Sequence, residues 1–171
     1  DGSDERALET TNAALLARHA LGETREITVK GWGGEPVQVW LVYPPGFDPK
    51  RKWPLMHSIH GGPHAAHGDV WHFRWNAQVF ANWGYVVTWH NFHGSSGFGQ
   101  AFTDAINPDR ITLPYEDTIK AADWLLAQPW VDRERMVAGG GSYGGFLATT
   151  LLGRPHPFKA LVAHAAVYNL Y

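Results

Sequence analysis

The feature that most constrains the fold of this chain is a glycine-rich run that contains the pattern G-x-S-x-G from Gly140 to Gly144. Residues 134–138 before it suit a short buried strand, and residues 146–152 after it are apolar enough for a buried helix. A serine on a sharp turn between a strand and a helix sits in strained backbone with its hydroxyl held out of the sheet. The pattern therefore predicts that Ser142 is a nucleophile, with the free N–H groups of the helix start beside it.

Two other interpretations of these glycines stay open at this point. Short patterns of this kind occur often by chance, so the run is also typical of a plain glycine-rich turn. A phosphate-binding loop is the second alternative, although the sequence has no G-x-x-x-x-G-K-[ST] pattern. The G-x-G-x-x-G spacing from Gly139 to Gly144 is not followed by an acidic residue about twenty positions later, which argues against a dinucleotide site.

Composition excludes several classes of protein. The chain has 171 residues, of which 44% are hydrophobic, and this is enough to bury one core. The net charge is −2, so no nucleic-acid partner is expected, and no apolar run approaches the length of about eighteen residues that a membrane span needs. The absence of cysteine excludes disulfides, thiolate zinc sites and a cysteine nucleophile. No signal-peptide pattern is visible, but a truncated chain would look the same, so the cellular location stays open.

The order of apolar and polar segments predicts an α/β fold. Residues 26–29 and 37–43 are expected to form an antiparallel hairpin. From residue 53 onward, strands and helices alternate, which calls for a mainly parallel sheet with helices on both faces. The expected strands are 53–59, 85–90, 134–138 and 159–164, all of them buried, and the expected helices are 76–83, 115–128 and 146–152.

Three loops are expected to meet at the carboxyl ends of the parallel strands, where open α/β sheets bind their ligands. These loops comprise residues 60–64, 91–99 and 140–144. An H-G-G segment in the first loop is a frequent source of one backbone N–H of an oxyanion hole, and the residue after the nucleophile supplies the other. Gly62 and Tyr143 are therefore predicted to be these two donors, with an ordinary turn as the alternative for the first loop.

Histidine and aromatic residues near these loops raise two further hypotheses. Imidazole and carboxylate groups are zinc ligands, but the spacing of the histidines around Asp69 fits no metal motif, so neither a metal nor another cofactor is expected. The histidines concerned are His60, His64, His67 and His72. Four aromatic residues are candidates either for a substrate pocket or for the core. They are Trp71, Phe73, Trp75 and Trp83.

Several segments taken together resemble the catalytic domain of the prolyl oligopeptidase family, and within it the branch of acylaminoacyl peptidases and dipeptidyl aminopeptidases. The resemblance runs from about residue 26 to the end of the sequence. The segments are H-G-G-P-H at 60–64, W-N-A-Q-V-F-A at 75–81, G-Y-V-V at 84–87, N-F-H-G-S-S-G-F-G-Q at 91–100 and G-G-S-Y-G-G at 140–145. The sequence departs from the family pattern at His93, where the family usually has Arg, and near Arg110, where it usually has Trp-Gly.

The resemblance implies an α/β-hydrolase fold and the hydrolysis of short peptides through an acyl-enzyme on Ser142. It also implies that Tyr143 and Gly62 hold the oxyanion, while a histidine and a carboxylate complete a catalytic triad. Residues 1–25 resemble a connector from a β-propeller that precedes the catalytic domain in the family. Residues 26–171 then correspond to the N-terminal part of that domain.

The triad has a gap in this sequence. α/β-Hydrolases carry an acid and then a histidine after the nucleophile, but no Asp or Glu follows Ser142 here. His156 lies between prolines and His164 ends a strand that precedes the acid in the family, so neither is expected to be the base. Either the acid and the base lie in a missing continuation or the domain is catalytically dead. An open hydrophobic edge at the last strand favours a continuation, so the chain is expected to be a fragment.

Three hypotheses for the function follow. The first is a serine hydrolase that cleaves peptide bonds near the N-terminus of short peptides. The second is a carboxylesterase, because acyl transfer to serine does not by itself select an amide over an ester. The third is a non-catalytic binding or assembly module, in which the serine carries out no chemistry.

Overall fold

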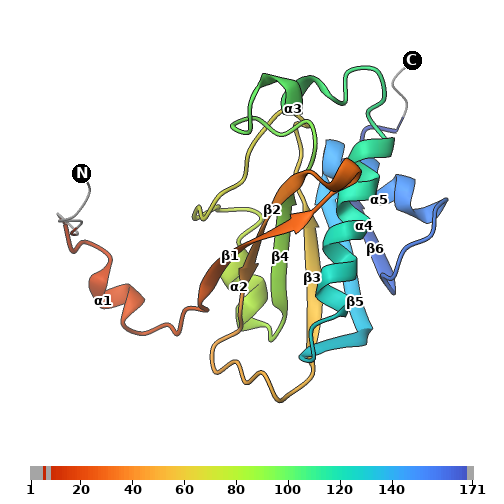
Figure 1. The fold of residues 1–171 in the computed structure, drawn as a ribbon. Coiled ribbons are helices and arrows are strands. Elements are labelled where there is room, and N and C mark those ends of the chain that lie inside the picture. Colours follow the sequence, from red (N-terminus) through yellow and green to blue (C-terminus); the bar gives the residue numbers. More distant parts are fainter. Residues whose placement is uncertain (1–5, 7–8, 169–171) are drawn as a thin grey trace.

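A single six-stranded sheet forms the centre of the structure, a computed structural model in which residues 6 and 9–168 are described. The strand order is β1-β2-β4-β3-β5-β6 (Figure 1). The strands are β1 (Thr24–Lys30), β2 (Pro36–Val42), β3 (Trp53–Ile59), β4 (Val86–Asn91), β5 (Val131–Gly141) and β6 (Ala160–His164). β1, β2 and β4 pair antiparallel, whereas β4, β3, β5 and β6 pair parallel. The predicted hairpin and the predicted parallel part are both confirmed.

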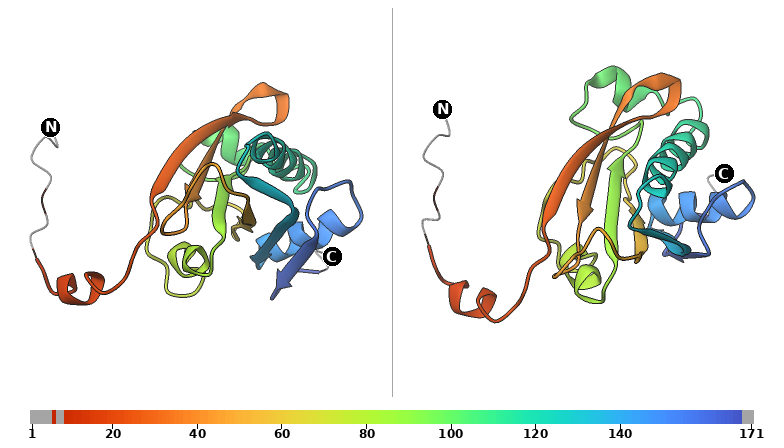
Figure 2. Two further views of the ribbon diagram at one scale, coloured as in Figure 1. Left: turned by 90° about the horizontal axis from the view of Figure 1, so that it is seen from below. Right: turned by 60° about the horizontal axis from the view of Figure 1, so that its bottom comes forward.

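Helices cover both faces of the sheet, as the alternating segments predict (Figure 2). α2 (Ala77–Asn82) packs on one face, where Ala81 joins a cluster with Val87 of β4. α4 (Thr112–Leu126) and α5 (Tyr143–Leu152) pack on the other face, in the cluster that contains Val86. Successive residues of a strand point to opposite faces, so β4 is buried along its whole length. The short elements are α1 (Ala13–Leu16), the 3₁₀ turn η1 (Trp32–Gly34) and α3 (Gln100–Asp104).

Several elements are longer than the sequence predicts, among them α4 and β5. α4 begins at Thr112 rather than at residue 115, because Pro114 lies in the first turn of the helix, where a missing N–H removes no helical hydrogen bond. β5 extends from Val131 to Gly141, well beyond the expected 134–138, because it pairs with β3 on one side and with β6 on the other. The extra residues carry β5 directly to the turn at Ser142.

The prediction that the last strand is buried is wrong for the described part of the chain. In β6 only Leu161 is partly buried, and Val162 is 55% exposed. The parallel pairing with β5 satisfies one edge of β6, and no described strand pairs with the other edge. Apolar composition correctly indicated a strand here, but burial depends on neighbours that composition does not reveal.

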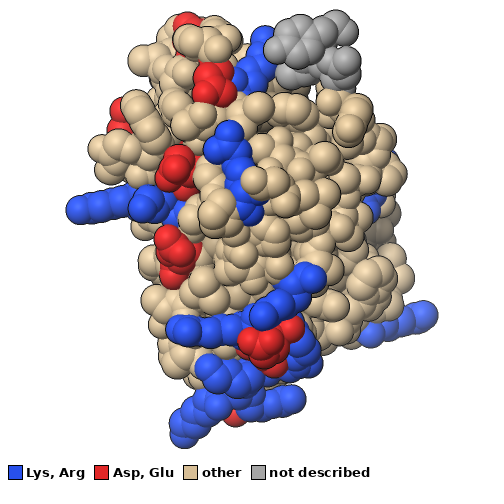
Figure 3. Space-filling view, turned by 90° about the vertical axis from the view of Figure 1, so that its right-hand side faces the viewer, with Lys and Arg blue, Asp and Glu red and all other residues tan. Residues whose placement is uncertain are grey.

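One group of Lys and Arg side chains lies away from the carboxyl ends of the parallel strands. Lys and Arg side chains gather at the opposite end of the molecule, which lies at the bottom of Figure 3. Arg135 pairs there with Asp132, and Lys159 pairs with Glu134.

α1 has no buried residue and lies apart from the sheet (Figure 1). Within the described residues, no helix combines the length and the hydropathy that crossing a membrane requires.

Candidate active site

Ser142 occupies a sharp turn between the end of β5 and the start of α5. Its backbone has φ 56° and ψ −119°, a conformation that costs a residue with a side chain about 1–3 kcal/mol. Its N–H donates to the carbonyl of His164 on β6 (3.1 Å), and its carbonyl accepts from the N–H of Phe146 (3.0 Å). The neighbouring strand and helix therefore hold the strained turn, and the side chain of Ser142 is exposed.

Glycine is required on both sides of Ser142 because the end of β3 approaches the turn closely. A Cβ atom at Gly140 would lie 2.2 Å from the carbonyl oxygen of Ile59, and one at Gly144 would lie 2.0 Å from the same oxygen. Real Cβ atoms do not approach backbone oxygens so closely, so only glycine fits at these positions. The glycines of the G-x-S-x-G pattern thus allow β3 and the turn to pack against each other.

The H-G-G loop that follows β3 lies against the candidate nucleophile. A Cβ atom at Gly61 would be 3.4 Å from the Cβ of Ser142 and 3.0 Å from the carbonyl oxygen of Gly141. Gly62 comes next, with φ 131°, in the region that favours glycine. Within the described residues, neither the Gly62 N–H nor the Tyr143 N–H donates a hydrogen bond. The structure therefore brings the two predicted loops together and leaves both predicted donors without a partner.

The ring of Tyr143 points away from the turn into the core. It is 5% exposed, and its hydroxyl donates to the carbonyl of Arg110 (2.5 Å). Burial raises the pKa of Tyr143 well above its usual value, so the phenol is a neutral hydrogen-bond donor. The side chain of Tyr143 therefore anchors α5, while its backbone N–H lies at the first position of the helix.

A cleft of about 710 Å³ opens beside Ser142. Its wall includes His60, Gly61, Trp75, Trp89, Ser142 and His164. Of the four aromatic candidates, only Trp75 lines the cleft. The other three do not belong to the core either, because Trp71 is 55% exposed, Phe73 94% and Trp83 67%. His164 meets Trp75 edge to face, with 5.9 Å between ring centroids.

The described residues contain no group of three His, Asp or Glu side chains that could hold a metal ion.

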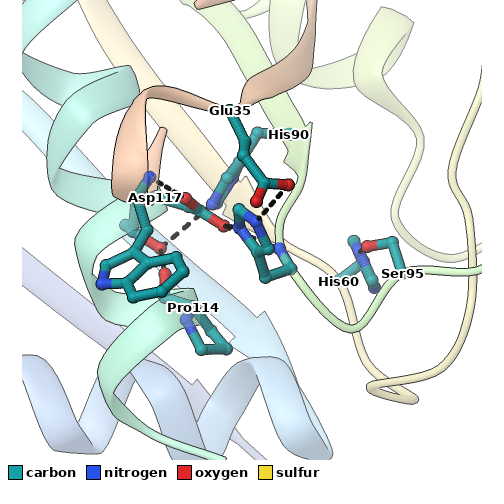
Figure 4. A network of polar contacts seen from close by, with 9 residues as sticks. Glu35, His60, His90, Ser95, Pro114 and Asp117 are labelled. Atoms are coloured by element: carbon teal, nitrogen blue, oxygen red, sulfur yellow. Dashed lines mark hydrogen bonds and ion pairs between the residues drawn. The ribbon is translucent and has the colours of Figure 1, made fainter. Parts of the chain in front are cut away.

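The loop after β4 is anchored by a buried ion pair that sequence reasoning did not find. His93 Nδ1–H donates to Asp117 Oδ2 on α4 (2.7 Å), and the backbone N–H of His93 donates to the same oxygen (2.6 Å). The other oxygen of Asp117 accepts from the N–H of Trp32 (2.8 Å), and His93 Nε2 lies 3.3 Å from Glu35 (Figure 4). Burial acts to lower the pKa of His93, but the two carboxylates outweigh it and raise this pKa. In the sequence, only the departure from the family pattern at position 93 pointed to an unusual site here.

A second buried network, also missed from the sequence, joins β3 and β4. His57 Nε2 lies 3.0 Å from His90 Nδ1, and both side chains are fully buried. Thr88 Oγ1 lies 2.7 Å from His57 Nδ1, and Thr118 Oγ1 lies 3.1 Å from His90 Nε2. Burial lowers the pKa of His57 to about 4 and holds the pKa of His90 well below its usual value. In the sequence, the positions of His57 and His90 inside two apolar strands pointed to such a buried polar network.

Comparisons with known proteins agree with this geometry. The model of the prolyl oligopeptidase family matches residues 71–171. A probable dipeptidyl-peptidase 5 from Aspergillus terreus is 47% identical over 135 residues, which cover 77% of this chain and 19% of the relative. The dipeptidyl-peptidase 5 of Schizosaccharomyces pombe is 38% identical over 169 residues, which cover 95% of this chain and 25% of the relative. The chain thus spans between a fifth and a quarter of the length of these relatives.

Solved structures show the same relationship. An acylaminoacyl peptidase in complex with Z-Gly-Gly-Phe-chloromethyl ketone superimposes with a TM-score of 0.85 at 25% identity, covering 96% of this chain and 26% of that chain. The dipeptidyl peptidase 4 of Porphyromonas gingivalis gives a TM-score of 0.80 at 29% identity, with coverages of 95% and 24%. The predicted α/β-hydrolase fold and the predicted branch of peptidases are both confirmed. The chain belongs to the prolyl oligopeptidase family.

Proposed function

We propose that this chain is part of a serine peptidase that cleaves peptide bonds near the N-terminus of short peptides. One observation carries the proposal: Ser142 is exposed in the cleft on a strained turn, beside the H-G-G loop. The names of the relatives support peptides as substrates, because they are dipeptidyl peptidases and acylaminoacyl peptidases. The carboxylesterase and the non-catalytic module have no comparable support.

In the proposed reaction, Ser142 Oγ attacks the carbonyl carbon of the scissile bond and its proton passes to a histidine. The carbonyl oxygen becomes an oxyanion, which accepts hydrogen bonds from the backbone N–H groups of Tyr143 and Gly62. The histidine then gives the proton to the leaving amine, and water releases the acyl group from the serine. The start of α5 adds the positive end of a helix dipole next to the oxyanion.

The remaining members of the triad belong, in this proposal, to a segment outside the sequence. No Asp or Glu follows Ser142, so the acid and its histidine are assigned to a continuation of the domain. Residues 26–171 are then the N-terminal part of the catalytic domain. Residues 1–25 are proposed to connect it to a preceding β-propeller, and α1 lies apart from the sheet in keeping with such a role.

Labelling of the full-length protein with a fluorophosphonate probe tests the proposal. The wild type is expected to be labelled once, and Ser142→Ala is expected to abolish labelling and to reduce hydrolysis of a dipeptide anilide by about 10⁴-fold or more. Ser96→Ala is the matched control, because Ser96 lies on the neighbouring loop outside the cleft. Undiminished labelling of Ser142→Ala would refute the assignment of the nucleophile.

A further inference from the structure

His60 makes two hydrogen bonds that the proposed reaction does not use. Its Nδ1 lies 2.7 Å from the carbonyl oxygen of Gly61. Its Nε2 lies 3.0 Å from Ser95 Oγ, and Figure 4 shows these two side chains next to each other. The ring is 4% exposed and stacks on Phe92, with 4.2 Å between centroids and 11° between planes. Both nitrogens of a rigidly held ring are therefore committed to the loops after β3 and β4.

The partners of His60 determine where its proton lies. A carbonyl oxygen only accepts, so Nδ1 carries the proton and donates it to Gly61. Burial lowers the pKa of His60 to about 4, which leaves the ring neutral at physiological pH and makes Nε2 an acceptor. Ser95 Oγ–H must then donate to Nε2. Ser95 is fully buried, and its hydroxyl thereby stabilises the tautomer that has its proton on Nδ1.

The carbonyl that His60 holds belongs to the same peptide group as the N–H of Gly62. A peptide group is planar, so fixing the direction of the Gly61 C=O also fixes the direction of the Gly62 N–H. A hydrogen bond accepted by the C=O also polarises the group and strengthens its N–H as a donor. Glycines on both sides of this peptide leave the backbone free to rotate unless something restrains it. The His60 side chain supplies that restraint.

We infer that His60 is a positioning residue, which aims the Gly62 N–H at the oxyanion, and that Ser95 holds it in the required tautomer. The inference rests on the proposed function, because it needs an oxyanion beside Ser142. The loop that carries Ser95 is itself fixed: the Ser95 N–H donates to the carbonyl of Phe92 (2.9 Å), and Thr103 Oγ1 donates to the carbonyl of Ser95 (3.1 Å). Ser95 is thus a firm support for the ring.

The test compares a dipeptide ester with the matching thionoester in the full-length protein. Sulfur accepts hydrogen bonds more weakly than oxygen, so the ratio of the two rates reports on the oxyanion donors. His60→Phe keeps the stacking but loses both nitrogens; it is expected to lower kcat for the oxygen ester about tenfold to a hundredfold, with little change in KM. The oxygen-to-sulfur ratio is expected to fall by a similar factor, because the thionoester depends less on these donors.

Further variants separate positioning from a general structural effect. His60→Asn puts an amide N–H near the place of Nδ1 and is expected to recover most of the ratio. Ser95→Ala is expected to lower the ratio by a smaller factor, about threefold to tenfold, and it decides the matter if His60→Phe does not fold. His64→Phe is the matched control: His64 Nδ1 bonds to the carbonyl of Gly94 (2.9 Å) and not to the Gly61 carbonyl, so the ratio is expected to stay unchanged.

The possible outcomes separate this inference from the proposed function. A wild type that is not labelled at Ser142 refutes both. A wild type that is labelled and prefers the oxygen ester, with variants that slow both esters equally, refutes the role of His60 alone. A selective loss with the oxygen ester in His60→Phe and Ser95→Ala, recovered in His60→Asn, supports it.

Discussion

The His57–His90 pair and the His93 site are almost equally excluded from water, yet their pKa values shift in opposite directions. His57 and His90 are 0% exposed and His93 is 1% exposed. Burial lowers the pKa of the first two, whereas the carboxylates of Asp117 and Glu35 overcome the same effect and raise the pKa of His93. The comparison shows that the partners of a buried histidine, and not its burial alone, decide whether it carries a charge.

A chain of hydrogen bonds explains why the first pair needs no charge. Thr118 Oγ–H donates to the carbonyl of Pro114 (2.7 Å), so its oxygen accepts from His90 Nε2–H. His90 Nδ1 then accepts from His57 Nε2–H, and His57 Nδ1 accepts from the hydroxyl of Thr88. Each ring has one proton and two satisfied nitrogens. A second proton on either ring would break the chain inside the core.

The largest expected effect comes from removing the acceptor at the charged site. Asp117→Ala leaves the buried backbone N–H of His93, the part-buried N–H of Trp32 and the Nδ1–H of His93 without this acceptor, so the free energy of unfolding is expected to fall by about 3–5 kcal/mol. Urea-induced unfolding measures the loss. Asp123→Ala is the control on the same helix, because Asp123 is exposed, and its expected change is within about 0.5 kcal/mol. A loss in Asp117→Ala as small as in the control would contradict the prediction.

The second largest expected effect concerns the neutral His57–His90 pair and the stability of the fold at acid pH. The folded pKa of His57, about 4, lies below its unfolded value of about 6.5, so the unfolded state takes up protons first as the pH falls. The stability that this group contributes is complete above pH ~6.5 and is lost toward pH ~4, by about 3 kcal/mol.

Replacing His57 by glutamine isolates this contribution. His57→Gln is expected to lose less stability than the wild type between these two pH values, whatever its stability at neutral pH. A series of urea midpoints at decreasing pH measures the difference. Parallel pH curves for the two proteins would show that His57 does not titrate as described.

The smallest effect has the opposite pH dependence. The folded pKa of His93 lies above the unfolded value, so its stabilisation is complete below pH ~6.5 and is lost as the pH rises through the raised folded pKa. His93→Gln, which removes a charged hydrogen bond, is therefore expected to cost about 1–2 kcal/mol more at pH 6 than at pH 9, measured by urea unfolding.

Glu35→Gln provides the control for the His93 prediction. The side chain of Glu35 is 56% exposed, so solvent screens its interaction with His93, and the expected loss is below about 1 kcal/mol. A cost of His93→Gln that is equal at both pH values would mean that folding does not raise the pKa of His93. The contrast between the two buried histidine sites would then disappear.

Local patterns in the sequence were sufficient to predict the turn at Ser142 and most of the elements around it. Strand and helix periodicities extend over a few residues, and the steric demand for glycine at positions 140 and 144 acts within one turn. The expected convergence of the H-G-G loop on that turn follows from a general rule for parallel sheets, and Gly61 lies against Ser142 in the structure. The roles of Ser142, Gly62 and Tyr143 in catalysis remain proposals to be tested by labelling and kinetics.

The sequence by itself thus determined the strand, turn and helix that present Ser142, because those preferences are local. Only the tertiary structure decided which partners the histidines have, because these partners are distant in the sequence. His93 and Asp117 are 24 residues apart, and His60 and Ser95 are 35 residues apart. The parallel register of β3 and β4 sets His57 opposite Thr88, and no pattern along the chain fixes that register. A histidine's charge and tautomer depend on the groups that it meets across such a register, so both emerge only when the sheet has formed.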